Sequence, residues 1–109
     1  MDRKFDSNYF IMCPKSIVCE YDITTACLYG LIWSFCQMEL GYCILSQPQM
    51  AKKLGRSTRS INTKFGNLKK SDLIRILKRE RFPDGGVLLH TVTNHKELEK
   101  LDEKHKDKF

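Results

Sequence analysis

The sequence predicts one α+β domain in which several helices precede a β-hairpin. Apolar residues recur at helical spacing between residues 22 and 71. Two β-prone runs then flank the turn sequence Pro83-Asp84-Gly85-Gly86. The chain has 109 residues, of which 41% are hydrophobic and 29% are charged. This length and balance are typical of a single globular domain.

The first part of the chain is expected to be extended and then helical. Residues 1–14 predict an extended lead-in, because the residue before Pro14 avoids the helical region. Residues 16–21 predict a short helical turn. A longer helix is then expected, with its N-terminus capped by Asp22 or Thr24.

This longer helix is expected to run to about Leu40, where Gly41 would end it. Its apolar residues surround much of the helix and include Ile23, Cys27, Leu28, Tyr29, Leu31, Ile32, Trp33, Phe35 and Cys36. So much apolar surface indicates a central helix packed on more than one side, although part of it could instead form a dimer surface.

A short β-prone run, residues 42–45, leads into the next helix. Ser46 is expected to cap this helix, which covers residues 47–54. Pro48 lies in its first turn, and Gln49 completes the pattern of a capping box. These signals predict a brief helix with a well-defined start.

Gly55 is expected to end that helix, and a second helix follows after a short turn. Ser57 or Thr58 would cap the second helix, which runs to about Ser71. Its inward-facing apolar residues follow at helical spacing and are Ile61, Phe65 and Leu68.

The chain is expected to end with a hairpin and a polar helix. The strands are residues 74–82 and 87–93, and Asn94 is positioned to cap a helix over residues 95–108. That helix is rich in Lys and Glu, with a weak apolar face of Leu98, Leu101 and His105. This composition favours a solvated tail or a partner-docking element over a core helix.

The two middle helices resemble a helix-turn-helix. That motif needs a small residue in its first helix, a glycine in the turn and a branched apolar residue in the second helix; Ala51, Gly55 and Ile61 occupy these places. Leu54 supplies a further inward position. Asp72-Leu73-Ile74 follows, where winged-helix proteins usually have glycine first; aspartate also tolerates a left-handed backbone.

Residues 22–93 therefore resemble the winged-helix family, with the helix-turn-helix at about 46–71 and the wing at about 74–93. The resemblance implies a domain over residues 1–94, followed by a polar helix or tail over residues 95–109. A looser similarity to replication-initiator and accessory proteins of plasmids and phages rests on two segments, Phe10-Ile11-Met12-Cys13-Pro14-Lys15 and Asp22-Ile23-Thr24-Thr25-Ala26-Cys27-Leu28-Tyr29.

The positive charge is concentrated in one part of the chain. The formal net charge is +6, from 19 Lys and Arg against 13 Asp and Glu. Residues 46–82 alone hold 11 Lys and Arg and 2 Asp and Glu. A local excess of this kind is typical of nucleic-acid binding, whereas a merely solvated surface would spread it out.

The winged-helix resemblance implies roles for the polar residues of this basic stretch. The second helix would enter the major groove of DNA and read bases with Thr58, Arg59, Ser60, Asn62 and Thr63. Backbone phosphates would be contacted by Gln47, Gln49, Lys52, Lys53, Arg56, Lys64 and Lys69. The wing would present Lys78, Arg79 and Arg81, with the two arginines over the minor groove.

The other function classes have little support in the sequence. We expect no enzyme, because no glycine-rich phosphate loop or convergent acid–base pair is present. We expect no cofactor and no metal site, because the five cysteines and three histidines lack metal-ligand spacing. The cysteines, an odd number, predict reduced thiols that are mostly small core residues.

The sequence therefore predicts a sequence-specific double-stranded DNA-binding protein, a regulator or accessory factor of a mobile genetic element in transcriptional repression, conjugative transfer or replication. The alternative is a protein–protein adaptor in a transfer or replication complex, with DNA binding secondary. A protein partner or a weak homodimer is compatible with the apolar central helix. With no membrane-length apolar run and no apolar signal core, the expected location is cytoplasmic, without a membrane partner.

Overall fold

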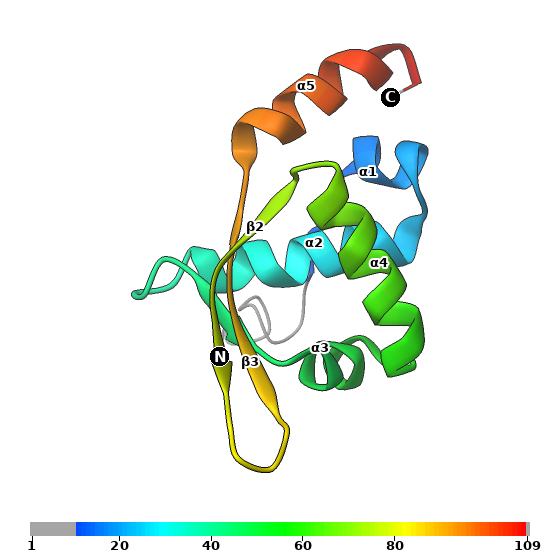
Figure 1. Ribbon diagram of the computed structural model, residues 1–109. Helices are drawn as coiled ribbons and strands as arrows, with labels where there is room; N and C mark the ends of the chain where they lie inside the picture. Colours follow the sequence, from blue (N-terminus) through cyan, green and yellow to red (C-terminus); the bar gives the residue numbers. More distant parts are fainter. Residues whose placement is uncertain (1–10, 109) are drawn as a thin grey trace, which may run out of the picture.

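The computed structural model describes residues 11–108 and confirms the α+β class (Figure 1). Residues 1–10, which hold most of the predicted lead-in, and residue 109 lie outside the described residues. The elements are α1 (Lys15–Glu20), α2 (Ile23–Cys36), β1 (Cys43–Leu45), α3 (Gln47–Leu54), α4 (Thr58–Lys70), β2 (Ile74–Arg81), β3 (Val87–Thr93) and α5 (His95–His105), followed by a 3₁₀ turn (Lys106–Lys108).

Helix α2 crosses the centre of the molecule and packs against α1, α4 and the sheet (Figure 1). Leu28, Tyr29 and Ile32 are all fully buried, and the adjacent residues Leu28 and Tyr29 point in different directions around the helix, which confirms the predicted packing on more than one side. Ile23 does not belong to this buried surface. It is the first residue of the helix and 60% exposed, because the core begins only one turn later.

The start of α2 is predicted correctly, but its end is not. Asp22 caps the helix by accepting a hydrogen bond from the Thr25 backbone N–H at 2.8 Å. The helix ends at Cys36 and not near Leu40, and Gly41 (φ 78°) lies in the following turn. Met38 and Leu40 are exposed, so extending the helix through them would bury no apolar surface.

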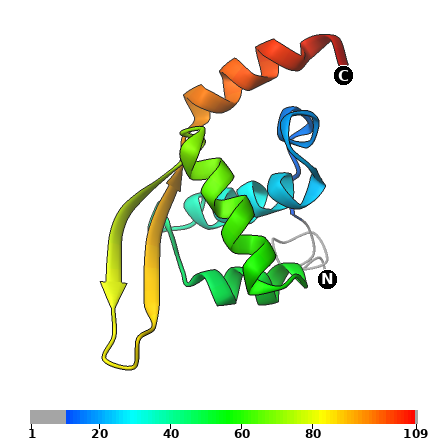
Figure 2. The same ribbon diagram turned by 45° about the vertical axis from the view of Figure 1, so that its right-hand side comes forward.

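The three strands form an antiparallel sheet in the order β1-β3-β2. Leu45, Leu89 and Thr91 are buried on one face, here called the inner face, which packs on α2. Beyond β1, the β2–β3 hairpin continues alone as an arm that projects past α3 (Figure 2). The hairpin turn and α5 therefore lie at opposite ends of the molecule.

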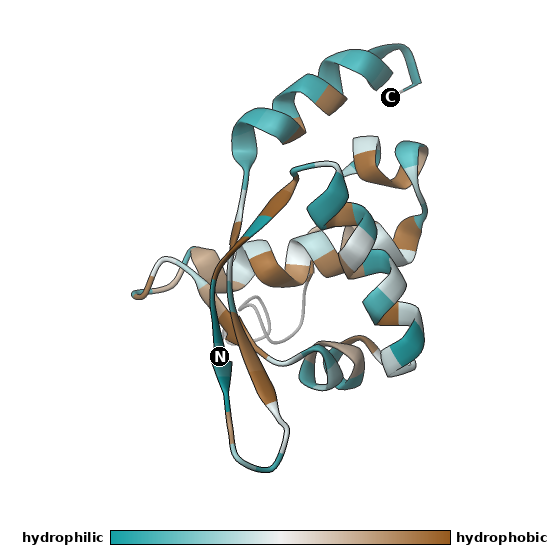
Figure 3. Ribbon diagram, in the orientation of Figure 1, coloured by the Kyte–Doolittle hydropathy of each residue, from teal (hydrophilic) through white to brown (hydrophobic). Residues whose placement is uncertain are grey.

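Helix α5 is polar over most of its surface but is packed against α1 (Figure 3). The predicted face is the one that is buried, with Leu98 and His105 almost inaccessible. The Ser16 hydroxyl donates a hydrogen bond to Asp102 across the contact. The α-helix ends at His105, and residues 106–108 form a 3₁₀ turn. The predicted α-helix, which ran to residue 108, was therefore three residues too long.

Asn94 lies at the N-cap position of α5 without capping it. Its side-chain amide instead donates to the backbone oxygen of Asp72 at 2.9 Å, and its backbone N–H donates to the Leu73 oxygen at 2.8 Å. Asn94 therefore ties the end of β3 to the start of β2. Within residues 11–108, none of the helices has the length and apolar character needed to span a bilayer.

Candidate nucleic-acid interface

Helices α3 and α4 begin and are joined as the sequence predicts. Ser46 Oγ accepts from the Gln49 N–H at 3.2 Å, while Gln49 Oε1 accepts from the Ser46 N–H at 2.8 Å, which completes the capping box. Gly55 takes the left-handed conformation (φ 66°) that ends α3. Ser57 caps α4 through the Ser60 N–H. These local contacts fix the turn between the two helices.

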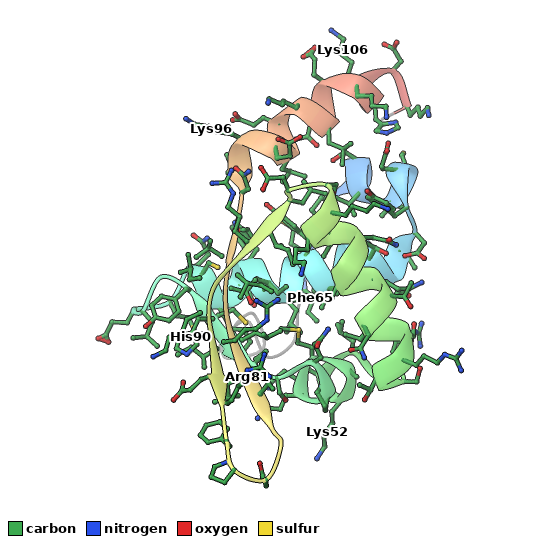
Figure 4. All side chains as sticks on the ribbon, in the orientation of Figure 1. Lys52, Phe65, Arg81, His90, Lys96 and Lys106 are labelled. Carbon is green, nitrogen blue, oxygen red and sulfur yellow. The ribbon has the colours of Figure 1, made fainter. Side chains whose placement is uncertain are left out.

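The apolar side of α4 holds it against α3 and α2. Ile61 and Leu68 are fully buried, and Phe65 is 3% exposed in the interior (Figure 4). Ala51 of α3, the small residue predicted at this crossing, is also buried, and α3 and α4 are in contact. With this side buried, the opposite side of α4 is left to the solvent.

The solvent side of α4 carries the residues predicted to read bases. Thr58, Arg59, Asn62 and Thr63 are exposed, while Ser60 is half-buried and contributes its N–H to the cap. The Thr63 hydroxyl donates to the Arg59 backbone oxygen at 3.3 Å. The Arg59 guanidinium forms no ion pair with residues 11–108. The side chain of Arg59 is therefore available to a ligand.

A groove of about 320 Å³ joins this side of α4 to α3 and the hairpin. Its lining residues come from three elements and are Ser46, Gln47, Pro48, Thr58, Asn62, Gly85, Gly86 and Val87. The groove thus brings together Gln47, Thr58 and Asn62, three of the residues with a predicted DNA contact. A role for the hairpin turn at this groove was not predicted, although its two glycines are the signal that a backbone here can approach closely.

A β-bulge decides which basic residues of β2 lie on the same face of the sheet as Val87, which lines this groove. Ile76 pairs with Thr91 and Lys78 pairs with His90, so Leu77 is an extra residue in β2. The bulge reverses the alternation of side chains beyond it. As a result, Arg79 and Arg81 share the inner face with their partners in β3, whereas Lys78 lies on the opposite, outer face.

The two acids within residues 46–82 are both paired away from the groove. Asp72 makes two hydrogen bonds to Arg75, which lower the pKa of its carboxyl group. Glu80 lies on the outer face with His90, and their hydrogen bond at 2.9 Å lowers the pKa of Glu80. Neither carboxylate therefore opposes the basic residues around the groove.

Asp72 also settles the departure from the usual winged-helix glycine at this position. Its φ is 64°, so it adopts the left-handed conformation that the sequence analysis allowed for aspartate. Its pairing with Arg75 and its contact with Asn94 compensate for that conformation.

Three of the predicted phosphate contacts have other surroundings. The ammonium group of Lys64 lies 3.0 Å from the Asp22 carboxylate, joining α4 to the start of α2. Lys53 lies over the ring of Phe35, with Nζ 5.8 Å from the centroid. Lys69 lies in the last turn of α4, where the helix dipole stabilises a positive charge. All three are therefore peripheral to the groove.

The remaining predicted contacts are Gln49, Lys52 and Arg56, which do not line the groove itself. Arg56 lies at a separate hollow with Lys53 and Ile23. Lys52 and Arg56 are exposed on α3 and on the turn that follows it, and Figure 4 shows Lys52 extending outward near the Arg81 end of the molecule. Gln49 uses its amide oxygen in the capping box, which leaves its NH₂ group for a phosphate. We call Gln47, Lys52, Arg56, Thr58, Arg59, Asn62, Thr63, Arg79 and Arg81 the basic face.

Outside the groove, the titratable and cysteine side chains are those from which a metal site would have to be built. In the described range, no three His, Cys, Asp or Glu side chains cluster as metal ligands would. All five cysteines are free; Cys43 belongs to the core, Cys13 and Cys36 pack against it while partly buried, and Cys19 is exposed. A second cavity, of about 620 Å³, lies between α2 and α5 and has Met12, Trp33 and Leu98 in its lining.

Comparisons with known proteins add no further assignment. No family model matches the chain, and no curated protein or solved structure matches it either. The arrangement of the basic face is therefore the basis for proposing a function.

Proposed function

We propose that the chain is a winged-helix protein that binds double-stranded DNA through the basic face. The observation that carries this proposal is the convergence of three elements on one groove: the N-terminus of α3, the solvent side of α4 and the hairpin turn. In this reading α3 and α4 form the helix-turn-helix, and the β2–β3 hairpin is the wing. The order of elements is that of the family the sequence resembles.

In the proposed complex, α4 lies in the major groove. Arg59 and Asn62 would contact base edges, because a guanidinium matches the acceptors of guanine and a carboxamide matches adenine. Lys52, Arg56 and the N-terminus of α3 would hold the phosphate backbone. Arg79 and Arg81 would follow the DNA over the minor groove from the inner face of the wing.

The biological role that fits such a molecule is regulation. A chain with a DNA-reading helix would act as a repressor, or as an accessory factor at a replication or transfer origin of a mobile element. Selection of bound sequences from a random duplex pool would identify the site. It would also show whether two half-sites occur, as expected if the protein dimerises.

The direct test is duplex binding at several salt concentrations. If about five phosphates are neutralised, the plot of log K against log salt should have a slope of about −4 to −5. The double variant Lys52→Gln/Arg81→Gln should reduce the size of this slope by about two units.

The matched control is Lys96→Gln/Lys106→Gln, which removes the same charge from α5 and the 3₁₀ turn after it, at the other end of the molecule (Figure 4). This control should bind like the parent. Equal losses in the two double variants would mean that net charge alone drives binding. No binding at low salt would contradict the proposal and favour the adaptor function, for which the cavity between α2 and α5 is the available surface.

A further inference from the structure

Two thiols meet where the chain enters α1. The Sγ atoms of Cys13 and Cys27 lie 2.6 Å apart, and both side chains are half-buried. Cys13 precedes α1, whereas Cys27 belongs to the second turn of α2. A disulfide joins its sulfur atoms at about 2.05 Å, so little movement separates this contact from a covalent bond.

The backbone around both cysteines is held in place independently of the sulfur atoms. Gly30 lies one turn after Cys27 on α2, and a Cβ atom there would come within 1.7 Å of the Met12 carbonyl oxygen. Only glycine permits this close approach. Ile11 and Cys13 also pack against the hydrophobic core. The segment before α1 is therefore seated on the face of α2 that carries Cys27.

The other three cysteines have different surroundings. Cys19 is exposed on α1. Cys36 is directed at the Thr91 carbonyl oxygen, 3.8 Å away, and burial raises the pKa of Cys43 to about 12. The chain thus places one particular pair of thiols in contact and holds the others apart from it.

We propose that Cys13 and Cys27 are a redox pair that closes to an intramolecular disulfide and fastens the segment before α1 to α2. The co-reactant is a small disulfide such as oxidised glutathione. One protein thiol, as its thiolate, attacks the oxidant and expels a first glutathione thiolate, which leaves a mixed disulfide. The second protein thiol, also as its thiolate, attacks the protein sulfur of that mixed disulfide and expels a second glutathione thiolate.

In this exchange the oxidant gains two electrons and the protein loses two thiol protons, so two molecules of reduced glutathione are formed. Burial, together with the hydrogen bond to Cys27, raises the pKa of Cys13 to about 11. The thiolate form of Cys13 is therefore scarce at neutral pH. Because both protein thiols must react as thiolates, closure should accelerate as the pH rises toward the pKa of Cys13. A reductant such as dithiothreitol should reopen the bond.

The disulfide would close a ring of 15 residues that contains α1. Such a ring restricts the unfolded chain, so the oxidised protein should melt at a temperature on the order of 10 °C higher than the reduced protein. This expectation does not depend on the proposed function.

The experiment is oxidation of the full chain with excess oxidised glutathione, followed by peptide mapping. The sequence has no Lys or Arg between Lys15 and Lys52, so trypsin places Cys13 on one peptide and the other four cysteines on another. Cleavage after Glu20 then releases Cys19, and chymotrypsin cleavage at Tyr29 and Trp33 separates Cys27 from Cys36. We expect Cys13 linked to the fragment that holds Cys27, with a mass lower by two hydrogens.

Single substitutions provide the controls. Cys13→Ser and Cys27→Ser should each abolish both the cross-link and the rise in melting temperature, whereas Cys19→Ser should retain both. Circular dichroism of the three reduced variants establishes that they are folded. A cross-link between Cys13 and another cysteine, or glutathione adducts that persist on folded Cys19→Ser protein without closing, would overturn the proposal.

Discussion

The two ends of the molecule are both rich in charged side chains, and they differ in how those charges are partnered. At the α1–α5 end, Lys104 lies 3.1 Å from Glu20, and Lys106 lies 2.7 Å from Glu103. On the basic face, Arg59, Arg79 and Arg81 form no ion pair within residues 11–108. Among the described residues, three of the five lysines that follow β3 therefore have an acidic partner, whereas these three arginines have none.

This difference shows why the number of charges alone does not locate a binding surface. Opposite charges a few ångströms apart largely cancel at a distance, and exposed pairs contribute little to stability. Like charges spread over one face instead add up to a field that attracts a polyanion. The five lysines of residues 95–108 and the arginines of the basic face are thus expected to behave differently in binding.

The largest expected effect tests whether the basic face depends on the core beneath it. Ile61→Ala empties a fully buried position between α3 and α4, so the free energy of unfolding should fall by roughly 2–5 kcal/mol. DNA binding should be lost only to the extent that the protein unfolds. Chemical denaturation and duplex binding measured on the same samples provide the check.

Ile23→Ala is the matched control, because it removes the same atoms from a side chain that is 60% exposed. Its effect on stability should stay within about 0.5 kcal/mol. If Ile61→Ala lost binding while remaining fully folded, the division of α4 into a structural side and a binding side would be wrong.

The next effect distinguishes base contacts from phosphate contacts on the basic face. Arg59→Ala should cost roughly 1–3 kcal/mol of binding free energy on the selected site and much less on random duplex, because only a base contact depends on the base. Titration of matched and scrambled duplexes measures both values. An unchanged ratio between them would mean that α4 is not the recognition helix.

A smaller effect on DNA binding is expected to differ between the two faces of β2. Arg81→Ala should weaken binding to matched and scrambled duplexes alike and reduce the salt slope by about one unit. Lys78→Ala removes the same charge from the outer face and should leave the slope unchanged, because the bulge at Leu77 turns Lys78 away from the groove. Equal slopes for the two variants would show that the bulge does not select the DNA-facing side.

Most of the fold follows from signals that lie close together in the sequence. The capping box at Ser46 and Gln49, the glycine that ends α3 and the hairpin turn each depend on four or so consecutive residues, and each forms as predicted. The buried side of α4 also follows from local spacing. The presence and order of the helices and strands could therefore be predicted without the structure.

The remaining features depend on residues that are distant in the sequence. Lys64 forms its ion pair with Asp22, which lies at the start of α2. The side chain of Asn94 donates to the backbone oxygen of Asp72 and does not cap its own helix. Simple alternation along β2 from Ile74 would place Arg81 on the outer face, and only the pairing with β3 reveals the bulge. The end of α2 was missed because Met38 and Leu40 are apolar without being buried.

The smallest expected effect lies at the paired end of the molecule and concerns Glu20. Its carboxylate accepts hydrogen bonds from His105 at 2.8 Å and Lys104 at 3.1 Å, and these contacts, with His105 first, lower the pKa of Glu20 below its usual 4.5. Because the pKa is lower in the folded state, the contribution of Glu20 to stability is present above about pH 4.5. It is lost as the pH falls through the folded-state value.

Glu20→Gln should therefore lower the free energy of unfolding at neutral pH by less than about 1 kcal/mol, as befits a partly exposed ion pair. Its difference from the parent should shrink as the pH falls below 4.5, because protonated Glu20 and glutamine are then equally uncharged. Urea denaturation across this pH range measures the effect. Glu99→Gln is the control, since Glu99 contacts only His95 on its own helix, at 3.4 Å, among the described residues. A Glu20→Gln deficit that persisted unchanged in acid would show that shape, and not charge pairing, holds α5 to α1.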